Sequence, residues 1–136
     1  MTTDMTPNVR LVRRHYEDVV NHGDLAAVER DLADDFVDHA APPGTPPGPA
    51  SVKEWIVTIR GGFPDLHVTE EHVVAEGDRV GVLARWEGTH DGEFLGIAAT
   101  GRAVAIRGVV LWRIEGGRLA ERWSVLETSA LLAAIT

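Results

Sequence analysis

The chain has 136 residues, of which 44% are hydrophobic and 25% are charged, and its formal net charge is −8. This length and composition predict a single globular domain over residues 1–136. The negative charge argues against nucleic acid and anionic membranes as partners, because their phosphates would repel it. With no cysteine, disulfides, thiol nucleophiles and thiolate metal sites are excluded. The sequence shows neither a signal peptide nor a membrane-length apolar run, so we expect a cytoplasmic protein.

The N-terminal part of the chain predicts two helices and a short strand. Apolar residues recur at helical spacing over residues 6–20, with Tyr16 on the apolar face. Asp24 can cap a second helix over residues 25–32, because its carboxylate accepts hydrogen bonds from free N–H groups at a helix start. Residues 35–39 then read as a short strand.

A proline-rich segment and a third helix follow. Residues 40–50 contain five of the seven prolines, which rules out a regular helix or a central strand there. We expect this segment to form an ordered loop over the mouth of a cavity. Ser51, with Glu54 three residues later, fits a capping box for the third helix. Trp55 would lie on the inner face of that helix.

The second half of the chain predicts four long strands that pair as an antiparallel meander. Their expected ranges are 67–75, 79–90, 102–114 and 119–127. Gly77 and the pair Gly116-Gly117 supply the positive φ angles that tight hairpin turns require. The predicted fold class is therefore α+β, with a curved antiparallel sheet covered on its concave side by three helices. A pocket is expected between the two layers.

Several segments resemble the SnoaL-like polyketide cyclases. In the C-terminal half these are residues 88–97 (GTHDGEFLGI), 99–102 (ATGR) and 117–123 (GRLAERW). In the N-terminal half they are residues 21–25 (NHGDL) and 33–39 (ADDFVDH). The resemblance extends over nearly the whole chain. It implies the cone-shaped α+β barrel of the nuclear transport factor 2 and ketosteroid isomerase type. It also implies a cyclase that acts on an aromatic polyketide-like substrate without a metal or an organic cofactor.

Glu127 is the first candidate for catalysis. In a regular strand it would point the same way as Trp123 and Val125, which the pattern predicts to face inward. A carboxylate facing an apolar cavity has a raised pKa, as a general base that removes a carbon-bound proton requires. The resemblance implies the same role at this position, where the family usually has aspartate. The alternative is a solvated glutamate at a strand end or at the cap of a C-terminal helix.

Arg113 and His39 are the other catalytic candidates. Arg113 precedes Glu127 by fourteen positions on the neighbouring strand and, if it faces inward, can stabilise an enolate oxygen. Strand parity alone does not decide its direction. His39, at the end of the short strand, and His90, at the end of a long one, could each shuttle protons. For both, a structural role is the alternative. No histidine pair has metal-ligand spacing, so we expect no metal site.

Aromatic residues are expected to gather around the pocket, together with His90 as a substrate contact. These residues are Tyr16, Phe36, Trp55, Trp86 and Trp123. Such a lining suits a flat, conjugated or hydrophobic small molecule, although each residue could equally be an ordinary core aromatic.

The resemblance implies an intramolecular aldol reaction in which Glu127 removes a proton next to a carbonyl and later returns it. Two alternatives stay open: a cofactor-independent hydroxylase of the same pathways, and a non-catalytic small-ligand binder. The strand 102–114 is apolar on both faces and must be covered on both sides. We therefore expect a homodimer that pairs sheet against sheet, or a homotetramer.

Overall fold

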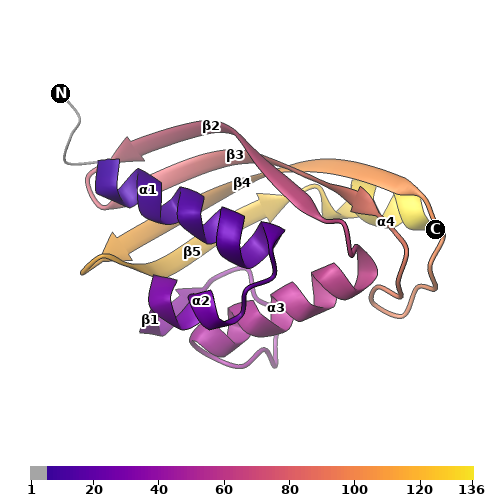
Figure 1. Cartoon of the computed structure of the whole chain (residues 1–136), viewed down its shortest axis with the longest axis horizontal. Helices are drawn as coiled ribbons and strands as arrows, with labels where there is room; N and C mark the ends of the chain where they lie inside the picture. The colour runs from indigo at the N-terminus through magenta and orange to yellow at the C-terminus, as the bar shows by residue number, and fades with distance from the viewer. Residues whose placement is uncertain (1–5) are drawn as a thin grey trace.

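The computed structural model describes residues 6–136 and confirms the α+β class (Figure 1). Its elements, in chain order, are α1 (Thr6–His15), the π-helical segment η2 (Tyr16–Asn21), α2 (Ala26–Asp31), β1 (Leu32–Asp38), α3 (Pro49–Gly62), β2 (His67–Glu76), β3 (Arg79–Thr89), β4 (Ala103–Glu115), β5 (Arg118–Leu126) and α4 (Thr128–Ile135). The four predicted long strands are present, and α4 is a further helix, which the sequence analysis considered only in the alternative interpretation of Glu127.

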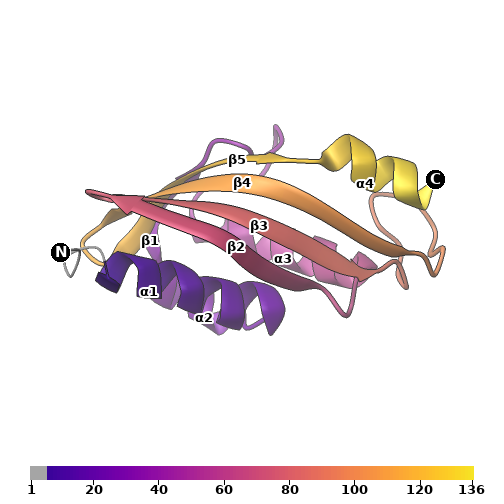
Figure 2. The same ribbon diagram turned by 90° about the horizontal axis from the view of Figure 1, so that it is seen from above.

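The five strands form one curved, unclosed sheet in the order β1-β5-β4-β3-β2. Strands β2 to β5 pair antiparallel in sequence order, as predicted, and β1 joins β5 in parallel. The hairpins turn at Gly77 (φ 58°) and at Gly116-Gly117 (φ 59° and 76°), where L side chains would be strained. Helices α1, α2 and α3 lie against one face of the sheet, and α4 lies beyond the end of β5 (Figure 2).

The core fills the space between these helices and the concave face of the sheet. Val12 of α1 and Val28 of α2 are fully buried against it, and Val82 and Val110 represent the inward rows of β3 and β4. Burial of such rows is the main stabilising contribution to the fold, at about 25 cal/mol per Å² of apolar surface. Among the described helices, none has both the length and the apolar character needed to cross a membrane.

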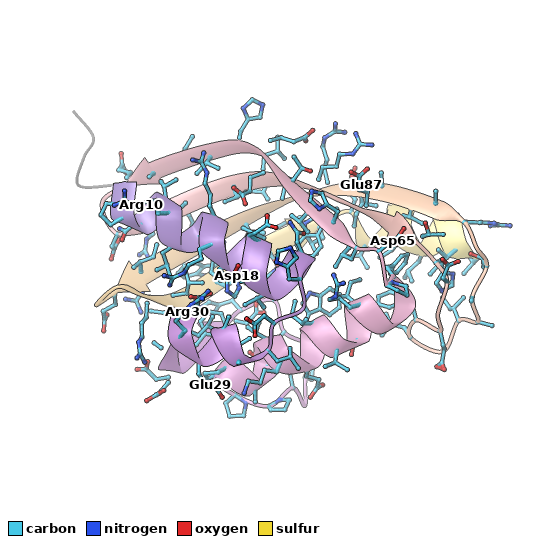
Figure 3. The ribbon with its side chains drawn as sticks, viewed as in Figure 1. Arg10, Asp18, Glu29, Arg30, Asp65 and Glu87 are labelled. Atoms are coloured by element: carbon cyan, nitrogen blue, oxygen red, sulfur yellow. The ribbon has the colours of Figure 1, made fainter. Side chains whose placement is uncertain are left out.

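A buried carboxylate joins the first two helices. Asp31 is fully buried, and its oxygens lie 2.8 Å from Arg14, 2.8 Å from Arg30 and 3.3 Å from His15 Nδ1. Burial opposes its charge, but these three hydrogen bonds outweigh burial and hold the pKa of Asp31 well below its ordinary value. Burial also lowers the pKa of His15, more than the adjacent carboxylate raises it. Arg30 extends the network to Asp18 at 2.8 Å (Figure 3).

The start of α3 differs from the predicted capping box. The helix begins at Pro49, after Gly48 with φ 68°, so the start lies before Ser51. The Ser51 hydroxyl donates to the Gly48 carbonyl at 2.7 Å, and Glu54 makes no cap. Proline at the first helical position fixes the start earlier than the serine pattern indicates. The Asp24 prediction is confirmed, because its carboxylate accepts two backbone N–H groups of α2 at 3.1 and 3.3 Å.

Strand β5 contains a β-bulge near its start. Leu119 pairs with Ile114 on β4, whereas the next pair along the strands joins Glu121 to Arg113. Ala120 is therefore an extra residue with no partner of its own, and both Leu119 and Ala120 are buried. An extra residue reverses the direction of every later side chain on the strand, because side chains alternate with a period of two.

The reversal corrects the predicted orientation of β5. Arg122 and Ser124 point to the concave side, where both line a cavity, whereas Trp123 and Val125 lie on the convex face. The expectation that Trp123, Val125 and Glu127 face inward is therefore wrong. It assumed unbroken alternation from Leu119 onward, and the bulge at Ala120 breaks it.

Candidate functional site

A cavity of about 480 Å³ opens between α3, α4 and the concave face of the sheet. Four aromatic side chains form much of its wall: Trp55, Phe63, Trp86 and Phe94. The loop after β1 contributes residues 40–42 and Thr45, so the predicted position of the proline-rich loop at a cavity is confirmed. A wall of this kind favours a flat, largely apolar molecule.

An ion pair between β1 and β5 lies in this wall. Arg122 Nη1 donates to Asp38 Oδ2 at 3.1 Å and to Oδ1 at 3.3 Å. The side chains are only 11% and 14% exposed, and the Arg122 guanidinium lies 5.7 Å from the Trp112 ring centre. Asp38 Oδ1 also accepts the Ala40 N–H at 2.9 Å. The carboxylate is therefore held in place from two directions, with Oδ2 the less engaged oxygen.

The guanidinium has hydrogen-bonding capacity to spare. Within residues 6–136, only Nη1 of Arg122 meets an acceptor, and Nε and Nη2 bond none. Arg122 is also the only arginine, lysine or histidine among the described residues that line the cavity. A carbonyl or carboxylate oxygen of a ligand would find charged N–H donors there.

A second, water-sized chamber of about 30 Å³ lies behind the cavity, and Asp38, Trp55, Trp86 and Arg122 line both spaces. Tyr16 also lines the chamber, and its hydroxyl oxygen accepts the indole N–H of the neighbouring tryptophan, Trp112, at 3.4 Å. That leaves the hydroxyl proton free to donate. Burial raises the pKa of Tyr16 to about 12, so the proton is retained at neutral pH. The buried indole N–H of Trp86 has no partner within the described chain.

Three residues that the sequence analysis chose for the pocket do come together, but on the convex face. Glu121 joins two of them: Arg113 Nε lies 2.6 Å from one of its oxygens and His39 Nε2 lies 2.7 Å from the other. His39 stacks on Trp123 with ring centres 4.9 Å apart. Hydrogen bonds from His39 and then Arg113 lower the pKa of Glu121. None of these side chains lines the cavity, so their expected inward placement is wrong.

Glu127 is exposed and ends the strand pairing. Its carboxylate accepts the Arg107 backbone N–H at 2.7 Å, and its carbonyl accepts the Leu131 N–H at 3.1 Å at the start of α4. Glu127 does not line the cavity. The arrangement corresponds to the alternative reading of Glu127, a solvated residue at a strand end and helix cap.

His90 and Phe36 lie outside the cavity wall. His90 is fully buried, and its Nδ1 accepts the Thr100 backbone N–H at 3.2 Å, which ties the ends of the loop between β3 and β4 together. Phe36 packs in the core beside Trp112, with ring centres 6.3 Å apart. Of the predicted contacts, Trp55 and Trp86 line the cavity and Tyr16 lines the chamber. Contact with a ligand stays a prediction for all three.

Sequence reasoning missed the ion pair of Asp38 and Arg122. Neither residue is among the candidates that the sequence analysis names. The signal that could have located Arg122 is the adjacent apolar pair Leu119-Ala120, which interrupts the alternation and is typical of a bulge. In the described part of the chain, no group of three histidine or carboxylate side chains is placed to hold a metal ion.

Comparison with known proteins places this chain in a family. A family model described as SnoaL-like polyketide cyclase matches residues 10–135. A protein of Jannaschia sp. CCS1, described as a candidate SnoaL-like polyketide cyclase, is 28% identical, with a TM-score of 0.85 over 96% of this chain and 92% of that chain. No curated protein sequence gives a match.

Two Streptomyces structures carry different functional descriptions. IdmH of Streptomyces antibioticus, described as a candidate polyketide cyclase, is 29% identical, with a TM-score of 0.80 over 94% of this chain and 96% of that chain. AclR of Streptomyces galilaeus, described as a candidate hydroxylase, is 26% identical, with a TM-score of 0.82 over 96% of each chain. Because the family model covers almost the whole sequence, the chain belongs to the SnoaL-like polyketide cyclase family.

Proposed function

We propose that this protein closes a carbon ring in an aromatic, polyketide-type ketone by an intramolecular aldol reaction. Asp38 acts as general base and acid, and Arg122 binds the reacting oxygen. The observation that supports this assignment is the ion pair itself, which places a carboxylate beside a guanidinium with free N–H groups in an otherwise largely apolar cavity.

The reaction needs no oxidant and no group beyond these side chains. Asp38 Oδ2 removes a proton from the carbon next to a ketone, and the electrons of that C–H bond form the enolate. Arg122 stabilises the enolate oxygen through a charge-assisted hydrogen bond. The enolate carbon attacks a second carbonyl of the same molecule, which forms a C–C bond and an alkoxide. Asp38 then returns its proton to the alkoxide, so atoms and charges balance.

The chamber behind the cavity also supports an orientation in which the ketone oxygen of the ligand points toward Arg122. The chamber is lined by Tyr16, Trp86 and Arg122. The Tyr16 O–H and the Trp86 indole N–H there have no acceptor within the described chain. Preorganised donors near a developing oxyanion stabilise it because they need no reorientation during the reaction. The ligand therefore enters with its ketone oxygen toward Arg122 and its rings between Trp55, Phe63 and Phe94.

Proton exchange on a simple ketone tests this function without the natural substrate. We expect the protein to accelerate deuterium exchange at the methyl group of 2-acetonaphthone in D₂O, followed by ¹H NMR. Asp38→Asn should reduce the exchange rate by about 10² to 10⁴, the usual contribution of a general base. The binding of 2-acetonaphthone, followed by quenching of tryptophan fluorescence, should change little, because the lost interaction belongs to the transition state.

Asp35→Asn is the matched control, because Asp35 is an exposed carboxylate on the same strand. It should leave the exchange rate unchanged. An equal loss of rate in both variants, or full activity in Asp38→Asn, contradicts the assignment. Binding of 2-acetonaphthone that weakens in Asp38→Asn in proportion to the lost exchange rate would make Asp38 a structural partner of Arg122.

The AclR likeness supports one alternative reaction. In a cofactor-independent hydroxylase the same carbanion would react with dioxygen instead of a second carbonyl, and oxygen consumption measured with the ketone would reveal it. A non-catalytic binder, the other alternative, would bind 2-acetonaphthone without any proton exchange.

We also propose a second copy of this chain as the partner of the convex sheet face. Val109 pairs across the strands with Val125 and Leu111 with Trp123, which sets an apolar patch in the middle of that face. Val109, Leu111 and Val125 are 54%, 38% and 78% exposed. Apolar side chains grouped in this way on a sheet favour burial against a like surface.

A further inference from the structure

A tight turn at the cavity mouth holds a leucine in an unfavourable conformation. Phe94 and Ile97 exchange two backbone hydrogen bonds of 3.0 and 2.9 Å, which leaves Leu95 and Gly96 as the central residues of the turn. Both have positive φ, at 50° and 81°. Turns of this pattern favour Asn-Gly or Gly-Gly, because a residue with a bulky side chain clashes with its own backbone at positive φ. Within residues 6–136, Leu95 is the only residue other than glycine with positive φ.

The base of this turn is firmly fixed. Phe94 is 2% exposed and packs edge-on against Phe63 and Trp55, with ring centres 5.4 and 6.5 Å away. The Gly92 N–H donates to the Gly62 carbonyl at 3.1 Å. A Cβ on Gly92 would clash with the Gly61 carbonyl oxygen of α3, so the loop sits directly against that helix. The strained residue is thus held in place by its surroundings.

Burial of the Leu95 side chain does little to offset this strain. It is 63% exposed, although it lines the cavity. Strain that persists in a residue without compensating burial indicates a functional constraint. Arg122, which is buried, marks the inner part of the same cavity. A ligand with its ketone oxygen at Arg122 reaches Leu95 only if its ring system extends to the mouth.

We propose that Leu95 is a specificity-determining residue that closes over the outer ring of the ligand and selects multi-ring aromatic ketones over single-ring ones. This inference rests on the proposed function, which places an aromatic ketone in the cavity. A bound ligand that reaches Leu95 covers an apolar side chain that water otherwise surrounds. This burial adds to the binding free energy only when the ligand is long enough to touch Leu95.

A series of ketones of increasing length tests the proposal. Acetophenone, 2-acetonaphthone and 2-acetylanthracene carry the same acetyl group on one, two and three rings, and quenching of tryptophan fluorescence measures their dissociation constants. Leu95→Asn should weaken binding of 2-acetylanthracene about tenfold and that of acetophenone less than twofold. It should also raise the melting temperature by about 2–4 °C, because asparagine adopts positive φ more readily.

Two further variants test whether the loss of affinity comes from the Leu95 side chain. Leu95→Gly should reproduce the loss of affinity for the long ketone, since it also removes the side chain. Val57→Asn is the matched control, because Val57 is 60% exposed on α3 and does not line the cavity. It should change neither the affinities nor their dependence on length.

The outcomes are distinct. Unchanged affinity of Leu95→Asn for 2-acetylanthracene overturns the proposal, as does an equal loss for all three ketones or a lower melting temperature. If the wild type binds none of the ketones, the proposed function fails as well. Length-dependent binding without proton exchange on 2-acetonaphthone refutes the cyclase and leaves the role of Leu95 intact.

Discussion

Beside strand β5, each face of the sheet carries one arginine–carboxylate pair, and the two pairs lie in very different surroundings. On the concave face, Arg122 and Asp38 are 11% and 14% exposed in the wall of a cavity. On the convex face, Arg113 and Glu121 are both 24% exposed, and Arg113 also binds Glu115, which is 76% exposed. Glu121, the strand partner of Arg113, directly precedes Arg122 in β5, so the two residues point to opposite faces. The β-bulge at Ala120 therefore decides which pair is inside.

The comparison shows that the composition of an ion pair does not define a site. On the convex face, Arg113 is already engaged by two carboxylates, and water competes for both groups. On the concave face, Arg122 keeps free N–H groups, and an apolar wall strengthens electrostatic interactions with anything that enters. The inner pair can therefore act on a ligand, whereas the outer pair mainly organises the sheet surface.

Removal of each arginine should separate the two pairs most clearly. Arg122→Met leaves Asp38 without its cation, and loss of one partner of a buried pair lowers the free energy of unfolding by roughly 3 kcal/mol. Arg113→Met should shift the urea midpoint only slightly, because solvent replaces the lost partner. Urea unfolding followed by circular dichroism measures both. Equal shifts would mean that the two environments do not differ energetically.

A charge on the convex face should break the proposed dimer. In Val125→Asp, the symmetric pairing of two sheets brings two carboxylates into an apolar interface, which should raise the dimer dissociation constant at least about tenfold. Sedimentation velocity at micromolar concentration checks this, with Val57→Asp, at an exposed position of α3, as control. A wild type that sediments only as a 14.8 kDa monomer would exclude the dimer.

Tyr16→Phe tests the chamber behind the inner pair. The variant keeps the ring and removes a neutral donor, which is worth about 1 kcal/mol. The exchange rate of 2-acetonaphthone should therefore fall about fivefold, much less than in Asp38→Asn. An unchanged rate would show that no oxygen of the bound ketone reaches Tyr16.

Acid should lower the free energy of unfolding through protonation of the buried His15. Its pKa in the folded state lies below its ordinary value, so between these two values the unfolded chain binds the extra proton. Stability is therefore complete above the ordinary histidine pKa of about 6.5 and falls as the pH drops below it. Thermal unfolding from pH 7.5 to 5.5 should show this decline, and His15→Gln should flatten it. A steeper decline in the variant would contradict the sign.

The smallest effect is expected for Glu127→Gln. Its carboxylate accepts a backbone N–H of β4 outside the cavity, and the amide oxygen of glutamine can accept the same bond. The exchange rate of 2-acetonaphthone should stay within about twofold of wild type. A loss as large as that of Asp38→Asn would return the catalytic role to Glu127 and refute the present assignment.

Local signals in the sequence were sufficient for most of the fold. Gly77 and the pair Gly116-Gly117 located both hairpins, and Asp24 located the start of α2, because each acts through its own neighbours in the chain. Trp55 and Trp86 were correctly placed at the cavity, since they lie on regular elements where periodicity holds. The helix α4 was considered only in the alternative interpretation of Glu127, and the start of α3 was set too late because Gly48-Pro49 took precedence over Ser51.

The candidate site was less predictable because it depends on pairing between strands. Whether Arg122 or Trp123 faces inward is decided by how Leu119 and Ala120 both pack into the core opposite Ile114. Regular alternation counted from Leu119 onward does not allow for such an extra residue, and only the adjacent apolar pair Leu119-Ala120 indicates it. Asp38 became recognisable only when the parallel pairing of β1 with β5 brought it to Arg122.

The extra residue at Ala120 also bears on how such a chain can change its chemistry during evolution. Loss of this one residue would restore simple alternation and turn Trp123, Val125 and Glu127 toward the cavity, while Arg122 and Ser124 would turn to the surface. The strand, its neighbours and the helices would keep their places. A single-codon insertion or deletion could thus exchange a whole row of cavity side chains at once, a change that point substitutions would reach only through several intermediates.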